Sequence, residues 1–157
     1  MCVRAIERRS NIPYQFNFVR HLKGRLRRKA RAWPGLFDLA PLGSIWTIRK
    51  FDDVYTAPSH GFHGASDYYQ RASALRLVQD IRVPTLILAA ADDPFVPPVQ
   101  FRDPAALRNN SHVAVAIQTH GGHCGFVANA VDGEDGFWAE RTAIDFLASV
   151  MRAPDVR

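Results

Sequence analysis

The pattern of apolar and polar residues changes character near residue 65. Over residues 1–33 apolar side chains recur every three or four positions, which favours an irregular helical segment interrupted at Pro13 and Gly24. Residues 34–64 hold seven glycines and prolines between large apolar side chains, so loops and short helices over a core are predicted there. The pattern thus divides the chain into a cap-like helical and loop region, residues 1–64, and a regular region, residues 65–157.

The regular region alternates predicted helices and strands. Ser66 is a candidate N-cap for a helix that runs to about Gln79. Two apolar runs without alternation, residues 84–91 and 112–119, are typical of parallel strands that are buried on both faces. A short helix is expected between them, near residues 104–108.

The last predicted element is an amphipathic helix over residues 137–151. Its apolar face comprises Trp138, Ile144, Leu147, Ala148 and Met151. The order of elements is that of βα units in a parallel, doubly wound sheet, so the fold class is α/β. Two strands are too few for an independently stable sheet. We therefore expect part of a larger sheet, with an open strand edge that favours self-association.

The composition is that of a soluble globular domain. Apolar residues make up 47% of the 157 residues and charged residues 22%. There is no run of about 20 apolar residues, which a membrane-spanning helix needs, and no secretory signal at the N-terminus. The two cysteines, Cys2 and Cys124, do not make a disulfide framework. A cytoplasmic protein in a reducing compartment is expected.

The charge is unevenly distributed. Residues 1–50 hold 12 Lys and Arg against Glu7 and Asp38, and seven of the basic residues lie between Arg20 and Arg31. Such a run can bind nucleic acid or anionic lipid, so a non-catalytic binding module that uses residues 20–31 is an alternative function. No aromatic residue is interleaved in the run and no nucleic-acid-binding motif accompanies it. A solvated helix face is therefore favoured, with no nucleic-acid partner.

Candidate chemistry follows the two predicted strands. Asp92 and Asp93 come directly after the first strand, and His120 and His123 come after the second. Because functional groups gather beyond the carboxyl ends of parallel strands, a carboxylate and an imidazole can meet there. Such a pair suits an acid that orients a general-base histidine. Each motif alone is common in turns, and their joint placement, aspartate first, is more specific.

A metal site is a competing interpretation of the same histidines. His120, His123 and Cys124 include one H-x-x-H pair, and His60 and His63 form another. Zinc sites need three or four ligands with further supporting contacts. The second pair lies in a segment rich in proline and glycine, where loops are predicted. No metal or other cofactor is predicted.

Several stretches in order resemble a known family. They read FDDVYTAPSHGF, DYYQRASA, IRVPTLILAAADDPFVP and HGGHCGF. From Phe51 to Phe126 the chain resembles the YheT-like α/β-hydrolases, related to the embryogenesis-associated and abhydrolase-domain lipases. This resemblance implies the C-terminal part of an α/β-hydrolase fold, parallel strands flanked by helices, with cap-like helices before it. It also implies a carboxylic-ester hydrolase that acts on small-molecule or lipid esters.

The resemblance also implies roles for individual residues. Asp93 corresponds to the acid of a Ser-Asp-His triad and His123 to its base, while Asp92 is the neighbouring candidate acid and His120 a loop histidine. The nucleophile elbow G-x-S-x-G, which should precede both, is absent. Its nearest approach, around Ser66, lacks the second glycine. We expect a truncated hydrolase that is inactive by itself.

Overall fold

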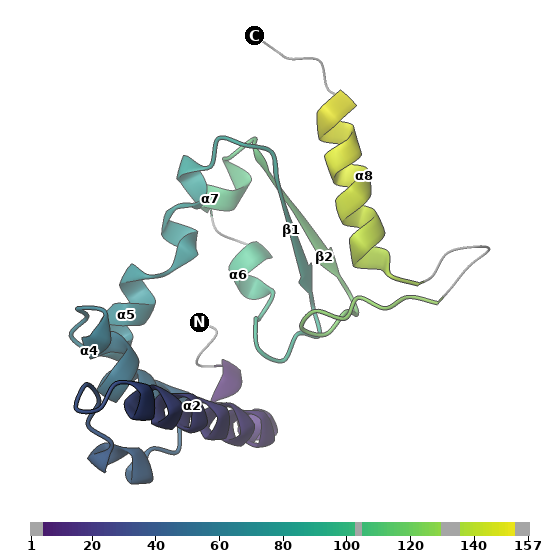
Figure 1. The fold of residues 1–157 in the computed structure, drawn as a ribbon. Helices are drawn as coiled ribbons and strands as arrows, with labels where there is room; N and C mark the ends of the chain where they lie inside the picture. The colour runs from purple at the N-terminus through teal and green to yellow at the C-terminus, as the bar shows by residue number, and fades with distance from the viewer. Residues whose placement is uncertain (1–4, 103–104, 130–135, 153–157) are drawn as a thin grey trace. The chain divides into compact units, whose positions relative to one another are not determined.

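The computed structural model describes residues 5–102, 105–129 and 136–152 and forms two compact units. The first unit comprises residues 2–73 and the second residues 74–157. Figure 1 shows the path of the chain through both. The interpretation of residues 1–64 as a cap over a hydrolase domain stays a prediction.

The first unit begins with a 3₁₀ turn, η1 (Arg9–Asn11), and one long helix, α2 (Ile12–Ala32). The predicted interruptions at Pro13 and Gly24 are wrong, because α2 continues through both. Pro13 lies in the first turn, where a missing N–H breaks no helical hydrogen bond. Gly24 costs about 1 kcal/mol relative to alanine, which 21 residues of continuous helix tolerate.

Short helical turns follow α2, as the density of glycine and proline predicts. They are η2 (Ala40–Ser44), α3 (Ile48–Phe51), the π-helical turn η3 (Asp52–Thr56), α4 (Ala57–Ser59) and α5 (Ala65–Arg71). The side chain of Thr47 caps α3 by accepting the N–H of Lys50 (3.1 Å). Helices this short are marginal alone, so packing against α2 must hold them.

A small apolar core holds the first unit together. It consists of Val19, Leu26, Leu42, Ile45, Phe51 and Tyr55. Ile45 is completely buried, and the Tyr55 hydroxyl donates to the carbonyl oxygen of Asp38 (2.8 Å). The core therefore joins one face of α2 to the short turns that follow it.

The predicted single helix over residues 66–79 is wrong at both ends. Helix α5 begins at Ala65, whose N–H donates to the Asp53 carboxylate (2.7 Å), so Asp53 rather than Ser66 satisfies its first turn. It ends at Arg71, and two 3₁₀ turns follow, η4 (Ala74–Arg76) and η5 (Val78–Asp80). The chain passes between the two units after residue 73, so no single core packs one continuous helix there.

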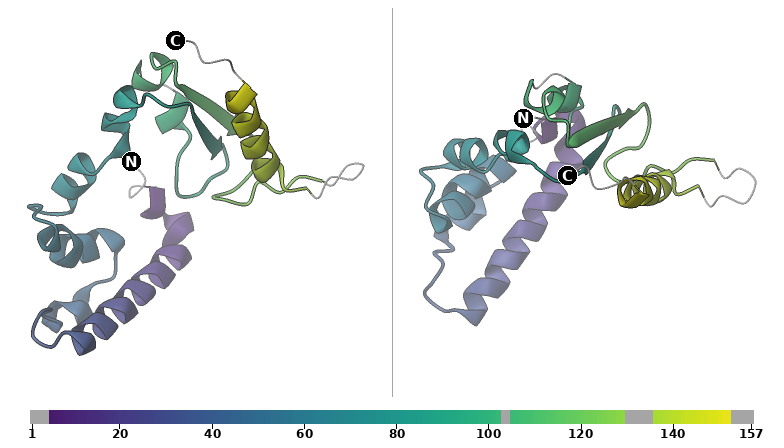
Figure 2. Two further views of the ribbon diagram at one scale, coloured as in Figure 1. Left: turned by 45° about the horizontal axis from the view of Figure 1, so that its top comes forward. Right: turned by 90° about the horizontal axis from the view of Figure 1, so that it is seen from above.

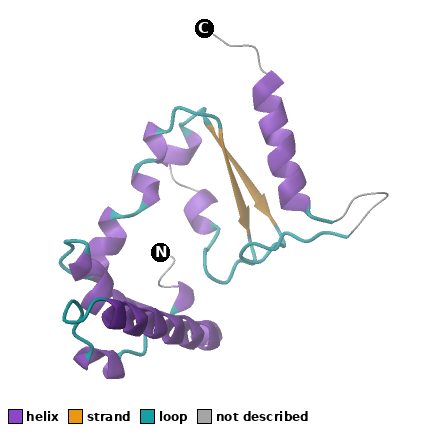
Figure 3. Ribbon diagram, in the orientation of Figure 1, coloured by secondary structure: helices purple, strands orange, loops and turns teal. Residues whose placement is uncertain are grey.

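The second unit is built on two parallel strands, β1 (Thr85–Ala90) and β2 (Val113–Gln118). Their register pairs Thr85 with Val113 and Ala90 with Gln118. The Ala91 N–H donates to the carbonyl of Gln118 (2.7 Å), which carries the pairing one residue further. The pairing confirms the predicted α/β class and brings both carboxyl ends to one edge, as Figure 3 shows.

Three helices accompany the strands: α6 (Val99–Arg102), α7 (Ala105–Arg108) and α8 (Trp138–Arg152). The short helix expected from Pro104 corresponds to α7, although Pro104 itself lies outside the described residues. Helix α8 contacts β1 and lies beside the sheet in Figures 1 and 2. The last helix was expected over residues 137–151, and the bounds of α8 differ from this by one residue at each end.

Much apolar surface of the second unit is uncovered. Helix α8 has no buried residue, and Ile144, Leu147 and Met151 on its apolar face are 65%, 59% and 85% exposed. Only Ala89 and Ala90 of the strand residues are buried. The prediction that both strands are buried on both faces is therefore wrong for the described chain. Two strands and a few helices supply too little surface to cover either face.

Candidate active site

The carboxylate of Asp93 is held in place by the turn that follows β1. Its Oδ1 accepts the backbone N–H groups of Phe95 (2.7 Å) and Val96 (2.9 Å), an arrangement typical of an aspartate that opens a turn. The side chain is only 7% exposed. With Oδ1 occupied by the turn, Oδ2 is directed to the loop after β2.

The imidazole of His123 meets that second oxygen. Its Nδ1 lies 3.0 Å from Asp93 Oδ2, although the two residues are 30 positions apart in sequence. The predicted proximity of Asp93 and His123 is therefore confirmed. Since an ionised carboxylate only accepts hydrogen bonds, Nδ1 carries the hydrogen and donates it, which leaves the lone pair of a neutral imidazole on Nε2. The ring is 49% exposed, and its partner in an edge-on contact is Phe95 (5.2 Å between ring centres).

The environment of Asp93 favours its ionised form. Burial of the carboxyl group opposes ionisation, but the hydrogen bonds from His123, Phe95 and Val96 outweigh it, so the pKa of Asp93 lies below its ordinary value. The carboxylate is then negative at neutral pH beside His123. It can stabilise an imidazolium that forms when Nε2 takes up a proton.

The lowered pKa of Asp93 predicts a pH dependence of stability. A carboxyl group whose pKa is lower in the folded chain contributes stability above its unfolded pKa, about 3.9, and loses it as pH falls through the folded value. Between pH 5 and pH 2.5 the melting temperature of the native chain should fall further than that of Asp93→Asn. Melts followed by circular dichroism test this. Parallel curves for the two chains would contradict it.

Asp92 ties the two loops together through the backbone. Its Oδ1 accepts the N–H groups of Gly121 (3.0 Å) and Gly122 (2.9 Å), and its Oδ2 lies 3.5 Å from His120 Nδ1. The hydrogen bond from Gly122, followed by smaller contributions, lowers the pKa of Asp92 below its ordinary value. The side chain of His120 is 86% exposed. The structure thus separates the candidate pairs: Asp93 faces His123, whereas Asp92 holds the loop that carries it.

A tight turn sets the position of His123. The carbonyl of Gly121 accepts the N–H groups of Gly125 (3.1 Å) and Phe126 (3.0 Å), so the loop folds back directly after the histidine. Phe126 adopts a positive φ of 48° and is buried. A Cβ on Gly121 would lie 2.6 Å from the Phe126 ring and 3.0 Å from the Ala90 Cβ. Glycine is therefore required at 121 by the close approach of the ring and of β1.

Replacement of Gly121 by alanine should destabilise the second unit by about 1–3 kcal/mol, the usual effect of overpacking a filled site. The added methyl group displaces the Phe126 ring or the loop, and His123 moves with the loop. Gly125→Ala is the matched control, because its Cβ meets only the Gly121 carbonyl oxygen at 3.4 Å. Urea denaturation should separate the two variants. Equal midpoints would show that the contact at Gly121 is easily relieved.

Two residues near the site were not anticipated from the sequence. Phe95 supplies both a backbone donor to Asp93 and the ring against His123. Phe126 is buried beneath the loop and lies 5.8 Å from the Trp138 ring. Each lies within three residues of the candidate acid or base, but only the backbone path shows where its ring is directed.

The histidine pairs do not gather into a metal site in the described part of the chain. His60 Nδ1 donates to the Thr56 carbonyl (2.8 Å) within the first unit, whereas His120 and His123 belong to the second. Cys124 is an exposed, free thiol, and Cys2 lies outside the described residues. Among the residues that the structure describes, no group of three or more His, Cys, Asp or Glu side chains could hold a metal ion.

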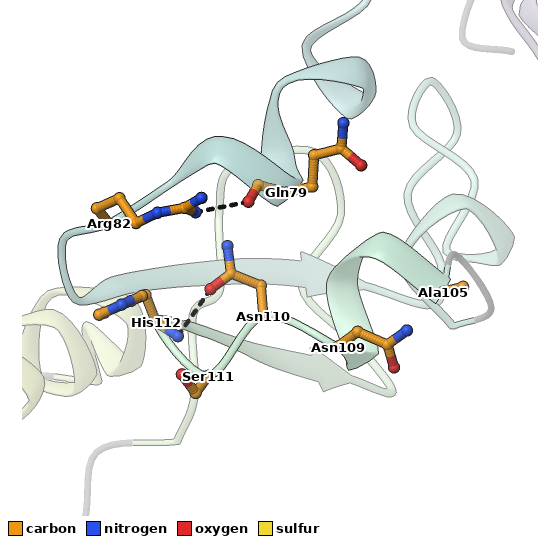
Figure 4. A pocket seen from close by; sticks show the side chains of 7 residues that line it. All are labelled: Gln79, Arg82, Ala105, Asn109, Asn110, Ser111 and His112. Carbon is orange, nitrogen blue, oxygen red and sulfur yellow. Dashed lines mark hydrogen bonds between the residues drawn. The ribbon is translucent and has the colours of Figure 1, made fainter.

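A polar pocket lies near the amino ends of β1 and β2, whereas Asp93 and His123 follow their carboxyl ends. It is lined by Gln79, Arg82, Ala105, Asn109, Asn110, Ser111 and His112, as Figure 4 shows. Several of these polar groups already hold the local backbone. The Asn110 amide donates to the carbonyls of Val78 (2.7 Å) and Ile81 (3.0 Å), and its oxygen accepts the His112 N–H (2.9 Å). These contacts give the pocket a structural role in joining η5 to β2.

The described helices include none that is both long and apolar enough to cross a membrane. No protein-family model matches the chain. No solved structure matches it either.

Comparison with curated proteins finds relatives that are named as esterases and lipases. The chain is 35% identical over 154 residues to YheT of Escherichia coli K12, which carries the name of an esterase; the match covers 97% of this chain and 44% of that protein. It is 36% identical over 110 residues to the medium-chain fatty acid ethyl ester synthase/esterase 2 of Saccharomyces cerevisiae, covering 70% of this chain and 23% of that protein. The chain is 28% identical over 115 residues to human monoacylglycerol lipase ABHD2, covering 72% of this chain and 27% of that protein. The chain thus spans less than half the length of each of these relatives.

Proposed function

We propose that this chain, which is homologous to part of the YheT-like esterases and abhydrolase-domain proteins of the α/β-hydrolase superfamily, supplies the acid and the base of a serine carboxylic-ester hydrolase. The observation that supports it is the hydrogen bond between His123 Nδ1 and Asp93 Oδ2 beyond the carboxyl ends of two parallel strands. That edge is where ligands and catalytic groups gather in open α/β sheets.

In this proposal His123 acts through Nε2. As a serine hydroxyl attacks the ester carbonyl, Nε2 accepts the hydroxyl proton, and the positive charge that forms on the ring is stabilised by the Asp93 carboxylate. His123 then returns the proton to the departing alkoxide, which leaves as the alcohol. Water hydrolyses the acyl-enzyme by the same exchange, again with Nε2 as the base.

The serine itself lies on a segment outside this sequence in our proposal. The chain contains no G-x-S-x-G, and the order of a hydrolase triad places the serine before the acid and the histidine. Ser66, the nearest approach to the motif, lies in α5 of the first unit, and its Oγ accepts from Arg49 (3.4 Å). The missing segment can belong to a longer polypeptide or to a separate chain; the proposal requires only that it supplies the elbow.

The uncovered apolar surface of the second unit supports a missing partner segment. Ile144, Leu147 and Met151 on α8 are more than half exposed, and in the described residues β1 and β2 pair only with each other. Burying apolar surface of this kind contributes about 25 cal/mol per Å². We propose that the segment with the elbow packs here, and that self-association of the chain replaces this packing when the segment is absent.

Esters of fatty acids are the substrate class that we propose. The name of the yeast relative refers to medium-chain fatty acid ethyl esters, and the name of the human relative refers to monoacylglycerol. Both are carboxylic esters with an apolar acyl chain. The Asp93–His123 pair requires only a carbonyl that a serine can attack, so the acyl length is set elsewhere in the complete enzyme.

A chimera tests the proposal directly. The stretch of Escherichia coli YheT that this chain matches is replaced by this chain, so the rest of the relative remains. We expect the chimera to hydrolyse p-nitrophenyl butyrate and to be labelled by a fluorophosphonate probe. The 157-residue chain alone should show neither saturable turnover nor labelling, because His123 has no hydroxyl to activate. Labelling of the chain alone at one of its own serines, or a well-folded chimera without activity, would contradict the proposal.

A further inference from the structure

The first unit contains a second cavity that the proposed hydrolase chemistry does not use. It has a volume of about 480 Å³, within the range of about 300–1,000 Å³ that is usual for small-molecule sites. Its walls come from α2, α3, η3 and α4 and from the loop at Phe37, all within residues 2–73. The cavity therefore belongs to one compact unit.

The floor of the cavity is apolar and rigid. Leu26, Phe51 and Tyr55 line it and also belong to the buried core of the unit. Leu22 and Phe37 extend the apolar lining from either side of that core. The rings of Phe51 and Tyr55 contact each other with 5.2 Å between their centres. A hydrocarbon chain would find a preformed surface here.

One wall of the cavity is positively charged. Arg25 and Lys29 line it from α2, four residues apart and hence on one face of the helix, and both are exposed. Among the described residues no ion pair joins either side chain to a carboxylate. Like charges at this spacing disfavour each other, and five further basic residues lie between Arg20 and Arg31 without an acidic one. An anion at this wall would relieve that repulsion.

Polar groups complete the lining of the cavity. Ser59 and His60 line it from the end of α4, and His60 Nδ1 donates to the Thr56 carbonyl, so Nε2 is left for a ligand. The charge of the Asp38 carboxylate acts on Tyr55. Burial raises the pKa of Tyr55, and the negative charge of Asp38 raises it further. Asp38 itself accepts the N–H of Ala40 (2.9 Å). A negative head group is therefore favoured beside Arg25 and Lys29 rather than beside Asp38.

We propose that this cavity binds a single-chain anionic amphiphile, with the apolar chain on Leu26, Phe51 and Tyr55 and a carboxylate or phosphate head group between Arg25 and Lys29. The arginine can hold either head group through two parallel hydrogen bonds. The proposal concerns binding alone and is independent of the Asp93–His123 pair.

Titration of the full 157-residue chain with decanoate, below its micelle concentration, tests the proposal. Binding is followed by calorimetry and by amide shifts in a ¹H–¹⁵N spectrum. Decanoate and decyl phosphate should bind, with shifts confined to residues around the cavity; the stronger of the two identifies the head group. Decanol should bind at least fivefold more weakly, and decyltrimethylammonium and inorganic phosphate should not bind. Equal binding of decanol would show a merely apolar cavity and overturn the proposal, as would binding only to anionic vesicles.

Matched double variants separate the cavity from the general charge of α2. Arg25→Gln with Lys29→Gln should weaken decanoate binding about tenfold. Arg27→Gln with Arg31→Gln removes the same charge from the same helix outside the cavity and should change binding less than twofold. Equal weakening by both pairs would overturn the proposal. Ser59→Trp, which keeps every charge and adds a bulky side chain to the lining, should weaken binding of decanoate and decyl phosphate alike; unchanged binding in this variant would also contradict the site.

Discussion

Replacement of His123 by alanine in the chimera should lower kcat for p-nitrophenyl butyrate by about 10⁴- to 10⁶-fold, the range seen when the histidine of a serine hydrolase triad is removed. The reason is that His123 is the imidazole that the Asp93 carboxylate orients to take the serine proton. Labelling by a fluorophosphonate should disappear with the activity, because the probe reports the same activated hydroxyl. Initial rates over a range of substrate concentration measure the loss.

The two aspartate–histidine pairs provide internal controls for that result. His120→Ala should leave kcat within about threefold, because this side chain is 86% exposed and pairs with Asp92 rather than with Asp93. Asp93→Asn should lower kcat about 10⁴-fold, since the neutral amide cannot stabilise the imidazolium and can donate to Nδ1, which favours the wrong tautomer. An equal loss in His120→Ala and His123→Ala would mean that the loop as a whole, rather than one imidazole, supports activity.

Replacement of Ile45 by alanine should lower the free energy of unfolding of the first unit by about 2–5 kcal/mol. Ile45 is completely buried in the core that joins α2 to the short turns, so the lost methyl groups leave a cavity. Urea denaturation followed by tryptophan fluorescence suits the measurement, because Trp33 and Trp46 both belong to this unit.

Ile144→Ala on α8 is the control for the same chemical change. Its side chain is 65% exposed, so we expect a loss of less than about 0.5 kcal/mol in the isolated chain at concentrations where it is monomeric. In the chimera the same substitution should become more destabilising, because the proposed partner segment covers this face of α8. A large loss in the monomeric chain would show that the chain buries this face by itself.

Local sequence patterns were sufficient to predict the strands and the loops that follow them. Apolar runs of strand length identified β1 and β2 to within a residue or two, because the parallel strands of a complete sheet are usually covered on both faces and so show no polar alternation. Topology then placed the aspartates and the histidines at one edge of the sheet, because two parallel neighbours end there, and the family resemblance singled out Asp93 and His123. The same rules failed at the helices, where Asp53 rather than Ser66 caps α5 and α2 continues through Gly24. Caps and breakers are weak signals that tertiary contacts override.

By itself the sequence determined that aspartates and histidines follow two predicted parallel strands and that it contains no nucleophile elbow. The family resemblance paired Asp93 with His123, and the tertiary structure shows why these two side chains meet. Neighbouring side chains in a turn point in different directions, so the backbone path assigns Asp93 to His123 and Asp92 to the N–H groups of Gly121 and Gly122. The tertiary structure also decided which apolar faces are buried in a core. Periodicity shows that α8 has an apolar face, but whether Ile144 is buried depends on what packs against it, and the described residues leave it open.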